Sequence, residues 1–533
     1  MRLRTRLLAC LLALVAVSGC APAAPASIAA SPGAVQGTVT RAMTDEPASL
    51  DPQGAANSGL NLVLPYLFDT LITRQADGKF VGLLAESWQV AADGKSVDVK
   101  LRPGVKFHDG SPLDAAAVVF TFDRFKKQGD KSPIAGNIKE IDSVQAVDNL
   151  TVRFSLKQPN ATIISTLAMP HAGILSPAAV AAAGAEMGRK PVGTGPLKFA
   201  EWQPGVSLTL VRNPDYNWGT PEAQNRGPVR FEKLVFKVVP DASTQLAALQ
   251  SGEVDVLFVN EPSQLARLEQ NKALQVRQVN LDSLIYLGYN CAKPPFDDVR
   301  VRQALSHAVD KQQVIATALA GMGKAAYTPL TPSMLGYDES LKSYGQGFDL
   351  ARAKALLGEA GFSQAADGSW QRQGQKLAGR LLTSTRAPNE AIATVLQSQF
   401  KALGVPVEIQ QLDSSAVMTA TTQGAFDLLL WRYEWNDPDA LNIYLGTSRI
   451  RQTNRAFYSN KEVDALLQSG LVEFDLAKRA AIYGDAQKKI LADAPWQPLY
   501  LPVEAMVSRT RVQGIKVGAL GRMLVNDVTV VGQ

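Results

Sequence analysis

The feature that most restricts the fold is a helical repeat of apolar residues that passes into strand patterns within a few positions. Four apolar side chains recur on one face of a predicted helix: Ile392, Val395, Leu396 and Phe400. Gly404 follows them, and glycine commonly closes the last turn of a helix because it adopts a left-handed conformation at little cost. We therefore predict a helix over residues 389–403.

Two strand patterns follow this helix. Val405, Val407 and Ile409 alternate with the period of a strand, and residues 426–431 are apolar almost without a break. A continuous apolar run is typical of a strand that is buried on both faces of a sheet. A helix, a strand and a buried strand in this order predict an α/β domain, which we place at residues 281–495.

The same mixture of periods occurs elsewhere in the chain. Alternating apolar residues predict strands at 97–101 and 206–210. Residues 301–309 repeat with helical spacing, with Asp298 or the aspartate before it as the N-cap and Gly321 past the end. The fold class is therefore predicted to be α/β.

The chain begins with the features of an export signal. Three arginines within the first six residues precede an apolar run at 7–17, and residues 17–20 read Val-Ser-Gly-Cys. A helix needs about 20 residues to span a bilayer, so this run is too short for a permanent transmembrane helix. We predict a signal peptide at residues 1–19.

Residues 17–20 resemble a bacterial lipobox, in which cleavage precedes the cysteine and the thiol receives a lipid. Cys20 would then be the first mature residue and the membrane anchor. Residues 20–36 are rich in Ala, Pro, Ser and Gly and carry no charge, which predicts a lipidated tether that cannot bury enough apolar surface to fold. An ordinary secretory signal, with Cys20 incidental, is the alternative. Both predict an extracytoplasmic protein, in the periplasm or at the cell surface.

The cysteine content predicts a fold without a disulfide bond. Cys10 lies in the predicted signal and Cys20 would be acylated, so Cys291 is left alone and forms no intramolecular disulfide. Stability must come from apolar cores, and a chain of 533 residues is long enough for two or three domains.

Composition and motifs argue against several functional classes. The formal net charge of +5 includes the three signal arginines, and so weak an excess does not favour a nucleic-acid partner. The chain has no nucleophile elbow, phosphate loop or zinc-protease motif. Its three histidines, His108, His171 and His307, are far apart in the sequence, which argues against a histidine-based metal or acid–base site. We predict no enzyme activity, no metal and no cofactor.

Four blocks of sequence occur in a recognisable order. They are residues 49–52 with 64–71, residues 84–88 with 101–110 and 118–122, residues 193–196 with 213–216, and residues 296–305. Together they resemble the family 5 bacterial solute-binding proteins, which include periplasmic binders of dipeptides, oligopeptides and nickel. The resemblance implies a periplasmic-binding-protein-like α/β fold of the larger type, with two lobes, a hinge and an extra domain.

The resemblance also implies a domain order and a role. Domain I comprises 37–75, 190–280 and 496–533, domain II comprises 76–189, and domain III comprises 281–495. Crossings near 190, 280 and 495 would act as hinges. The implied function is that of the monomeric substrate-binding component of an ABC importer, which captures a small solute, foremost a peptide, and delivers it to the permease and ATPase subunits.

The densest group of aromatic and charged residues directly follows the apolar run at 426–431. It consists of Trp431, Arg432, Tyr433, Glu434, Trp435 and Asp437. Flat apolar rings beside hydrogen-bonding groups suit a small polar ligand, so we place the pocket here. Packing of Trp431 and Tyr433 in the core, with Glu434 and Arg432 as a solvated pair, is the alternative.

The resemblance assigns more specific roles within this group. Peptide binders of the family carry an aspartate that holds the ligand's ammonium group, and Glu434 stands at that position. The arginine that dipeptide binders use for the ligand carboxylate is absent, and Arg386 is the nearest substitute. Asn57 follows the domain I strand that faces the ligand, where a scaffold role is equally open.

The ligand class stays open at this point. An oligosaccharide, an opine or a nickel chelate are alternatives to a peptide, because stacked Trp and Tyr rings suit sugars and arginines suit a chelator. A sensory or interaction protein without transport is the alternative class.

Overall fold

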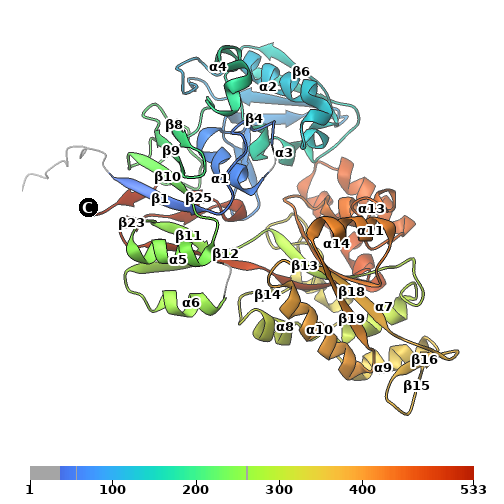
Figure 1. Ribbon diagram of the computed structural model, residues 1–533. Helices are drawn as coiled ribbons and strands as arrows, with labels where there is room; N and C mark the ends of the chain where they lie inside the picture. The colour runs from blue at the N-terminus through green and yellow to red at the C-terminus, as the bar shows by residue number, and fades with distance from the viewer. Residues whose placement is uncertain (1–36, 56, 260–261, 533) are drawn as a thin grey trace, which may run out of the picture. The chain divides into compact units, whose positions relative to one another are not determined.

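The apolar run at 426–431 forms most of a central strand in a six-stranded sheet of the computed structural model (Figure 1). The structure describes residues 37–55, 57–259 and 262–532. In spatial order the strands are β14 (Lys324–Ala325), β21 (Trp496–Leu501), β13 (Ser283–Tyr289), β20 (Leu428–Glu434), β18 (Gly379–Ser384) and β19 (Val407–Leu412). Leu428, Leu429 and Leu430 are all buried, because β20 lies between β13 and β18 and both faces of the sheet are covered. The predicted buried strand is confirmed, shifted by two residues at its start.

The helix that packs on this sheet was also predicted. Helix α10 spans Asn389–Leu403, and Gly404 caps it in the left-handed region with φ +93°. Its buried face carries Ile392, Leu396 and Phe400, which share one core with side chains of β13, β18 and β20. This face accounts for the helix, since burial of an amphipathic stripe supplies most of the stability of a helix in a folded protein.

The helix predicted from residue 301 towards Gly321 is wrong as a single element. Two helices occupy the stretch, α7 (Val299–His307) and α8 (Lys311–Ala318). The break arises at Asp310, whose side chain accepts hydrogen bonds from the backbone N–H groups of Gln312 and Gln313 and so starts a new helix. Asp298 caps α7, as predicted.

A seven-stranded sheet is built from both ends of the described chain. In spatial order its strands are β12 (Leu274–Asn280), β22 (Val503–Arg509), β11 (Val256–Val259), β1 (Thr38–Met43), β10 (Lys233–Val238), β9 (Ser207–Arg212) and β8 (Leu197–Gln203). Strand β1 runs parallel to β10 and β11, and the other pairs are antiparallel. Helices α1 (Ser58–Leu67), α5 (Ala242–Ser251) and α6 (Pro262–Glu269) supply apolar side chains to the cores on this sheet.

A third, four-stranded sheet packs against helix α2 (Ala115–Gln128). Its order is β4 (Ala85–Val90), β5 (Ser96–Leu101), β7 (Thr151–Leu156) and β6 (Ile141–Asp148). Val97, Val99 and Leu101 of β5 point into this core, which confirms the strand predicted there.

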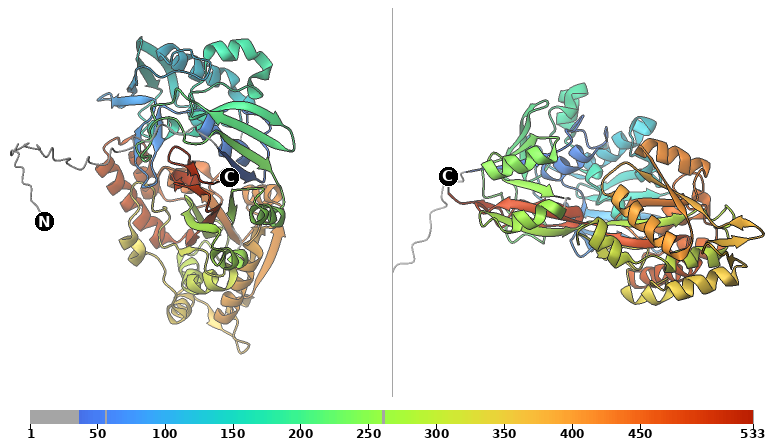
Figure 2. Two further views of the ribbon diagram at one scale, coloured as in Figure 1. Left: turned by 90° about the vertical axis from the view of Figure 1, so that its left-hand side faces the viewer. Right: turned by 60° about the horizontal axis from the view of Figure 1, so that its bottom comes forward.

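Two strands pass from the six-stranded sheet into the seven-stranded one. Strand β12 continues into β13 across residues 281–282, and β21 continues into β22 across Pro502, with the Leu281 N–H donating to the Pro502 carbonyl at 3.3 Å. In Figure 2 the later pair, β21 and β22, is red and runs on from one sheet into the other. Residues 496–501, placed in domain I from the sequence, pair with β13 and β14 and so belong to the six-stranded sheet.

The predicted signal at 1–19, Cys20 and the tether at 20–36 lie outside the described residues. Within the described part of the chain, no helix is both long and apolar enough to cross a membrane.

Candidate functional site

Side chains alternate between two environments along the end of β20. Arg432 and Glu434 are exposed, whereas Tyr433 is buried and Trp431 is half-buried. The alternation follows from the strand, because successive side chains point to opposite faces. The predicted cluster is therefore divided into a core half and an open half.

Tyr433 lies in the core half. Its ring stacks on Tyr444 at 5.3 Å and on Trp496 at 5.9 Å between centroids, and its hydroxyl donates to the carbonyl of Pro329. Both its ring faces and its hydroxyl are thus engaged within the protein, and Tyr433 offers no free group to a ligand. Trp431 borders the same core, with the Arg455 guanidinium 5.7 Å from its ring centroid.

Asp437 holds the fold in the same way. It is 2% exposed, and both carboxylate oxygens accept hydrogen bonds from Arg479, at 2.7 and 2.9 Å. A bidentate pair of this kind fixes the chain after β20, where Asp437 also accepts the N–H of Asp439 at 2.9 Å. The geometry assigns Asp437 to the scaffold.

Charged side chains of the seven-stranded sheet lie near the open half of the cluster. Arg386, in the loop before α10, interacts electrostatically with Arg432 and Glu434, and also with Glu504 of β22. Glu504 interacts in turn with Arg41 of β1. We call these five residues the charged cluster: Arg41, Arg386, Arg432, Glu434 and Glu504.

Burial and the charges of neighbouring side chains shift the pKa values of two members of the cluster. Loss of solvent lowers the pKa of Arg386, and the nearby charge of Arg432 lowers it further, whereas Glu434 opposes the shift. Burial raises the pKa of Glu504, and the negative charge of Glu434 adds to the increase. Each of these groups would gain from a partner of opposite charge.

Sequence reasoning missed Arg41 and Glu504. Arg41 is 4% exposed, donates to the hydroxyl of Tyr66 at 3.1 Å and lies 4.9 Å from the ring centroid of Phe258. Its Nε has no hydrogen-bond partner. An arginine within the otherwise mostly apolar second half of β1 was the available signal, since a charge is rarely buried in a strand without a role.

Asn57 serves a helix. Its side-chain oxygen accepts the N–H of Leu60 at 2.7 Å and so caps α1, while its amide nitrogen lies 3.5 Å from the carbonyl of Glu46. The cap explains the residue without a ligand.

A cavity of about 600 Å³ begins next to the end of β20. Its walls come from two stretches, residues 136–169 and residues 435–471, and Trp435 and Asn436 join it to the strand end. The lining is mostly polar and uncharged, with amides and hydroxyls from both stretches. Its size lies within the range of small-molecule sites in proteins, about 300–1,000 Å³.

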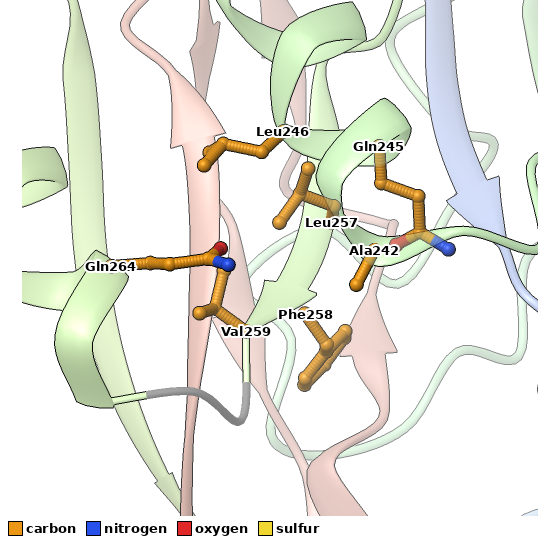
Figure 3. A pocket seen from close by; sticks show the side chains of 7 residues that line it. All are labelled: Ala242, Gln245, Leu246, Leu257, Phe258, Val259 and Gln264. Atoms are coloured by element: carbon orange, nitrogen blue, oxygen red, sulfur yellow. The ribbon is translucent and has the colours of Figure 1, made fainter.

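A second cavity is too small for a solute. It lies between α5, β11 and α6, has a volume of about 20 Å³, and is lined by Ala242, Gln245, Leu246, Leu257, Phe258, Val259 and Gln264 (Figure 3). A single water needs about 10–15 Å³, so this space fits one water at most.

The described residues contain no group of three or more His, Cys, Asp or Glu side chains placed to hold a metal ion. His108 and His171 each bond a backbone carbonyl, of Gly195 at 3.0 Å and of Pro52 at 2.8 Å. Both histidines therefore tie loops together.

Comparison with known proteins decides the family. Residues 79–452 match the bacterial extracellular solute-binding proteins, family 5, middle region. The chain belongs to this family. The family 5 chain is 32% identical over 474 residues to the glutathione-binding protein GsiB of Pectobacterium atrosepticum, covering 86% of this chain and 87% of that protein. The family is one of binding proteins, and the resemblance read from the sequence blocks is confirmed.

Solved structures support the same fold for this family 5 protein. HbpA2 from Haemophilus parasuis aligns with a TM-score of 0.81 at 26% identity, covering 93% of this chain and 100% of that one. The oligopeptide-binding protein AppA from Bacillus subtilis, in complex with a nonapeptide, aligns with a TM-score of 0.72 at 26% identity and covers 93% and 99%. The two-lobed α/β fold with a hinge is thus established.

Proposed function

We propose that this family 5 protein captures a peptide-like solute between the charged cluster and the cavity at Trp435, and delivers it to the permease and ATPase subunits of an ABC importer. It does no chemistry on the solute. It works as a monomer outside the cytoplasm, anchored through a lipid on Cys20.

The observation that carries the proposal is the mixed charge of the cluster. Arginines and glutamates from two sheets face one another there, and Arg41 and Glu504 are largely buried or half-buried. A zwitterionic solute supplies both signs at once, so an ammonium group next to Glu434 and a carboxylate next to Arg386 would each meet a charge of opposite sign. The cavity beyond Trp435 has room for the rest of a short peptide.

The cavity lining favours an oligosaccharide as the second candidate. Trp435 offers a flat ring, and the surrounding amide and hydroxyl side chains, such as Asn137, Thr162 and Asn436, match sugar hydroxyls. An oligosaccharide carries no charge, however, and would leave the cluster uncompensated.

Binding measurements on the full chain separate these candidates. Isothermal titration with glutathione, a nonapeptide, maltotriose and a nickel–histidine chelate should show saturable binding of a peptide-like ligand and of neither other class. Glu434→Gln and Arg386→Ala should each weaken that binding by roughly two- to fivefold, because both side chains are exposed and an exposed charge contact contributes up to about 1 kcal/mol.

Glu408→Gln is the matched control, since Glu408 is an exposed acid on β19 of the same sheet. It should bind as the wild type does. Binding of maltotriose alone, with no effect of Glu434→Gln, would replace the peptide proposal by the sugar proposal, and turnover of any ligand would refute the binding-only role.

A further inference from the structure

Within the cavity at Trp435, one buried carboxylate lacks a partner. Asp439 lines the cavity and is 7% exposed, yet its Oδ1 accepts no hydrogen bond. Among the described residues five aspartates are buried, namely Asp69, Asp255, Asp282, Asp437 and Asp439. Of these, Asp439 has the buried side-chain oxygen without a partner. Buried polar groups are nearly always bonded, so the exception calls for an explanation.

Asp437 shows that the protein can provide hydrogen-bond donors for a buried carboxylate in this turn. Asp437, two residues earlier, is bonded twice by Arg479. Asp439 receives only the side-chain amide of Asn442, at the start of α12 (Ala440–Leu445), while Arg479 and Arg449 act on it through their charge. Asp439 therefore borders the cavity with a carboxylate of which one enclosed oxygen, Oδ1, has no partner.

Several charged and titratable groups surround Asp439. Asp437, Arg479 and Arg449 are its charged neighbours, Tyr483 is a further titratable one, and Lys139 and Glu140 line the cavity from the stretch 136–169. Burial, and after it the charge of Asp437, raises the pKa of Asp439 to about 7. An N–H donor placed against Oδ1 would favour the ionised carboxylate, because it would replace the lost solvation.

We propose that the cavity is a subsite for an N–H group of the solute. This group, an ammonium or an amide, donates to Oδ1 of Asp439, and the inference rests on the proposed function. The residue is thus a specificity determinant beyond the charged cluster. It selects solutes that carry a nitrogen donor several atoms away from the group held at Glu434, as a peptide chain does.

The test compares Asp439→Asn with Glu140→Gln, which makes the same carboxylate-to-amide change at another acid of the lining. Glutathione is the probe, titrated calorimetrically at pH 5.5 and pH 7.5. The wild type should bind roughly 20-fold more tightly at pH 7.5, because with a pKa of about 7 the ionised fraction of Asp439 rises from about 3% to about 75% and apparent affinity follows the competent fraction.

Asp439→Asn should bind about tenfold more weakly than the wild type at pH 7.5 and should lose this pH dependence, whereas Glu140→Gln should keep it. Wild-type binding that is unchanged in Asp439→Asn would overturn the subsite and leave the proposed function intact. The circular dichroism spectrum and urea midpoint of each variant check that it folds.

A second experiment tests the subsite without glutathione. It is needed if glutathione does not bind the wild type, a result that would count against the proposed function itself. Crystals of the wild type soaked in methylammonium chloride should show the ammonium at Oδ1 of Asp439, and crystals of Asp439→Asn should not. Water alone at this oxygen in the soaked wild type would overturn the subsite.

Discussion

At the scale of single residues, the acids in the turn after β20 differ in how fully the protein bonds them. Asp437 and Arg479 form a buried ion pair in which every carboxylate oxygen is used, while Oδ1 of Asp439 has no partner. A group that is fully bonded within the protein has nothing left for a solute. Bonding state therefore distinguishes these neighbouring acids better than residue type does.

Arg479→Ala should unfold the protein at a much lower urea concentration. Removing one partner of a buried ion pair typically costs about 3–5 kcal/mol, because the other charge is left buried and uncompensated. Here Asp437 would lose its ion-pair partner, and Asp439 would lose one of its two neighbouring cations. Lys100→Ala removes the exposed pair with Glu86 and should leave the urea midpoint nearly unchanged. Equal midpoint shifts in the two variants would contradict the assignment.

The residues of the candidate site were only partly predictable from the sequence. Glu434 and Arg386 were proposed from the sequence, because a carboxylate after a buried strand and an arginine in the adjoining loop are local signals, and their contact with a ligand stays a prediction. Arg41 and Glu504 were not, since they stand more than 400 positions apart and meet only through the order of strands in the seven-stranded sheet. Tyr433 was misjudged because its burial depends on Tyr444 and Trp496, which pattern reasoning cannot place against it.

At the scale of elements, strong periodicity and clear stop signals decided which predictions succeeded. Helix α10 and strand β20 were found because one carries a regular apolar stripe and the other an unbroken apolar run. The boundary between α7 and α8 was missed because Asp310 looks like an ordinary polar position until its side chain is seen to cap a new helix. The partner of β21 was missed because a strand sequence does not specify its sheet.

The end of α10 gives a sharp test at this scale. Gly404 has φ +93°, and a Cβ there would lie 2.2 Å from the carbonyl oxygen of Gly368. Gly404→Ala should therefore cost more than the roughly 1 kcal/mol of a left-handed alanine alone. Gly374, with φ +79° and no atom within 4 Å of its Cβ position, is the control that isolates the strain. Urea midpoints that fall equally in both alanine variants would show that the contact with Gly368 does not matter.

At the scale of the whole molecule, a contact beside the cavity links chain segments far apart in sequence. Phe474, between α13 (Lys461–Val472) and α14 (Leu476–Asp493), packs on the core of the four-stranded sheet and lies against Gly94. Next to it, the Ala161 N–H donates to the Leu471 carbonyl at 2.8 Å. Leu471 also lines the cavity, so this contact borders the proposed binding space.

Phe474→Ala should weaken glutathione binding by about three- to tenfold and increase the radius of gyration of the unliganded protein in small-angle scattering. The reason is that loss of about 1–2 kcal/mol of apolar contact lowers the population of the arrangement that encloses the cavity. Leu476→Ala is the control, because Leu476, the first residue of α14, lies two positions after Phe474 and is 66% exposed. A control variant that behaves like Phe474→Ala would remove the special role of the ring.

The two-strand passage between the large sheets has a kinetic consequence. Strands β12–β13 and β21–β22 run side by side there, and Pro502 has no N–H to add to the ladder, so the pairing between the two strands is interrupted at the passage. Substitutions at positions 281 and 502 would alter how fast the protein opens, and hence the residence time of the solute, while every group that selects the solute stays the same. Two uptake systems with the same solute preference could in this way differ only in how fast they release the solute.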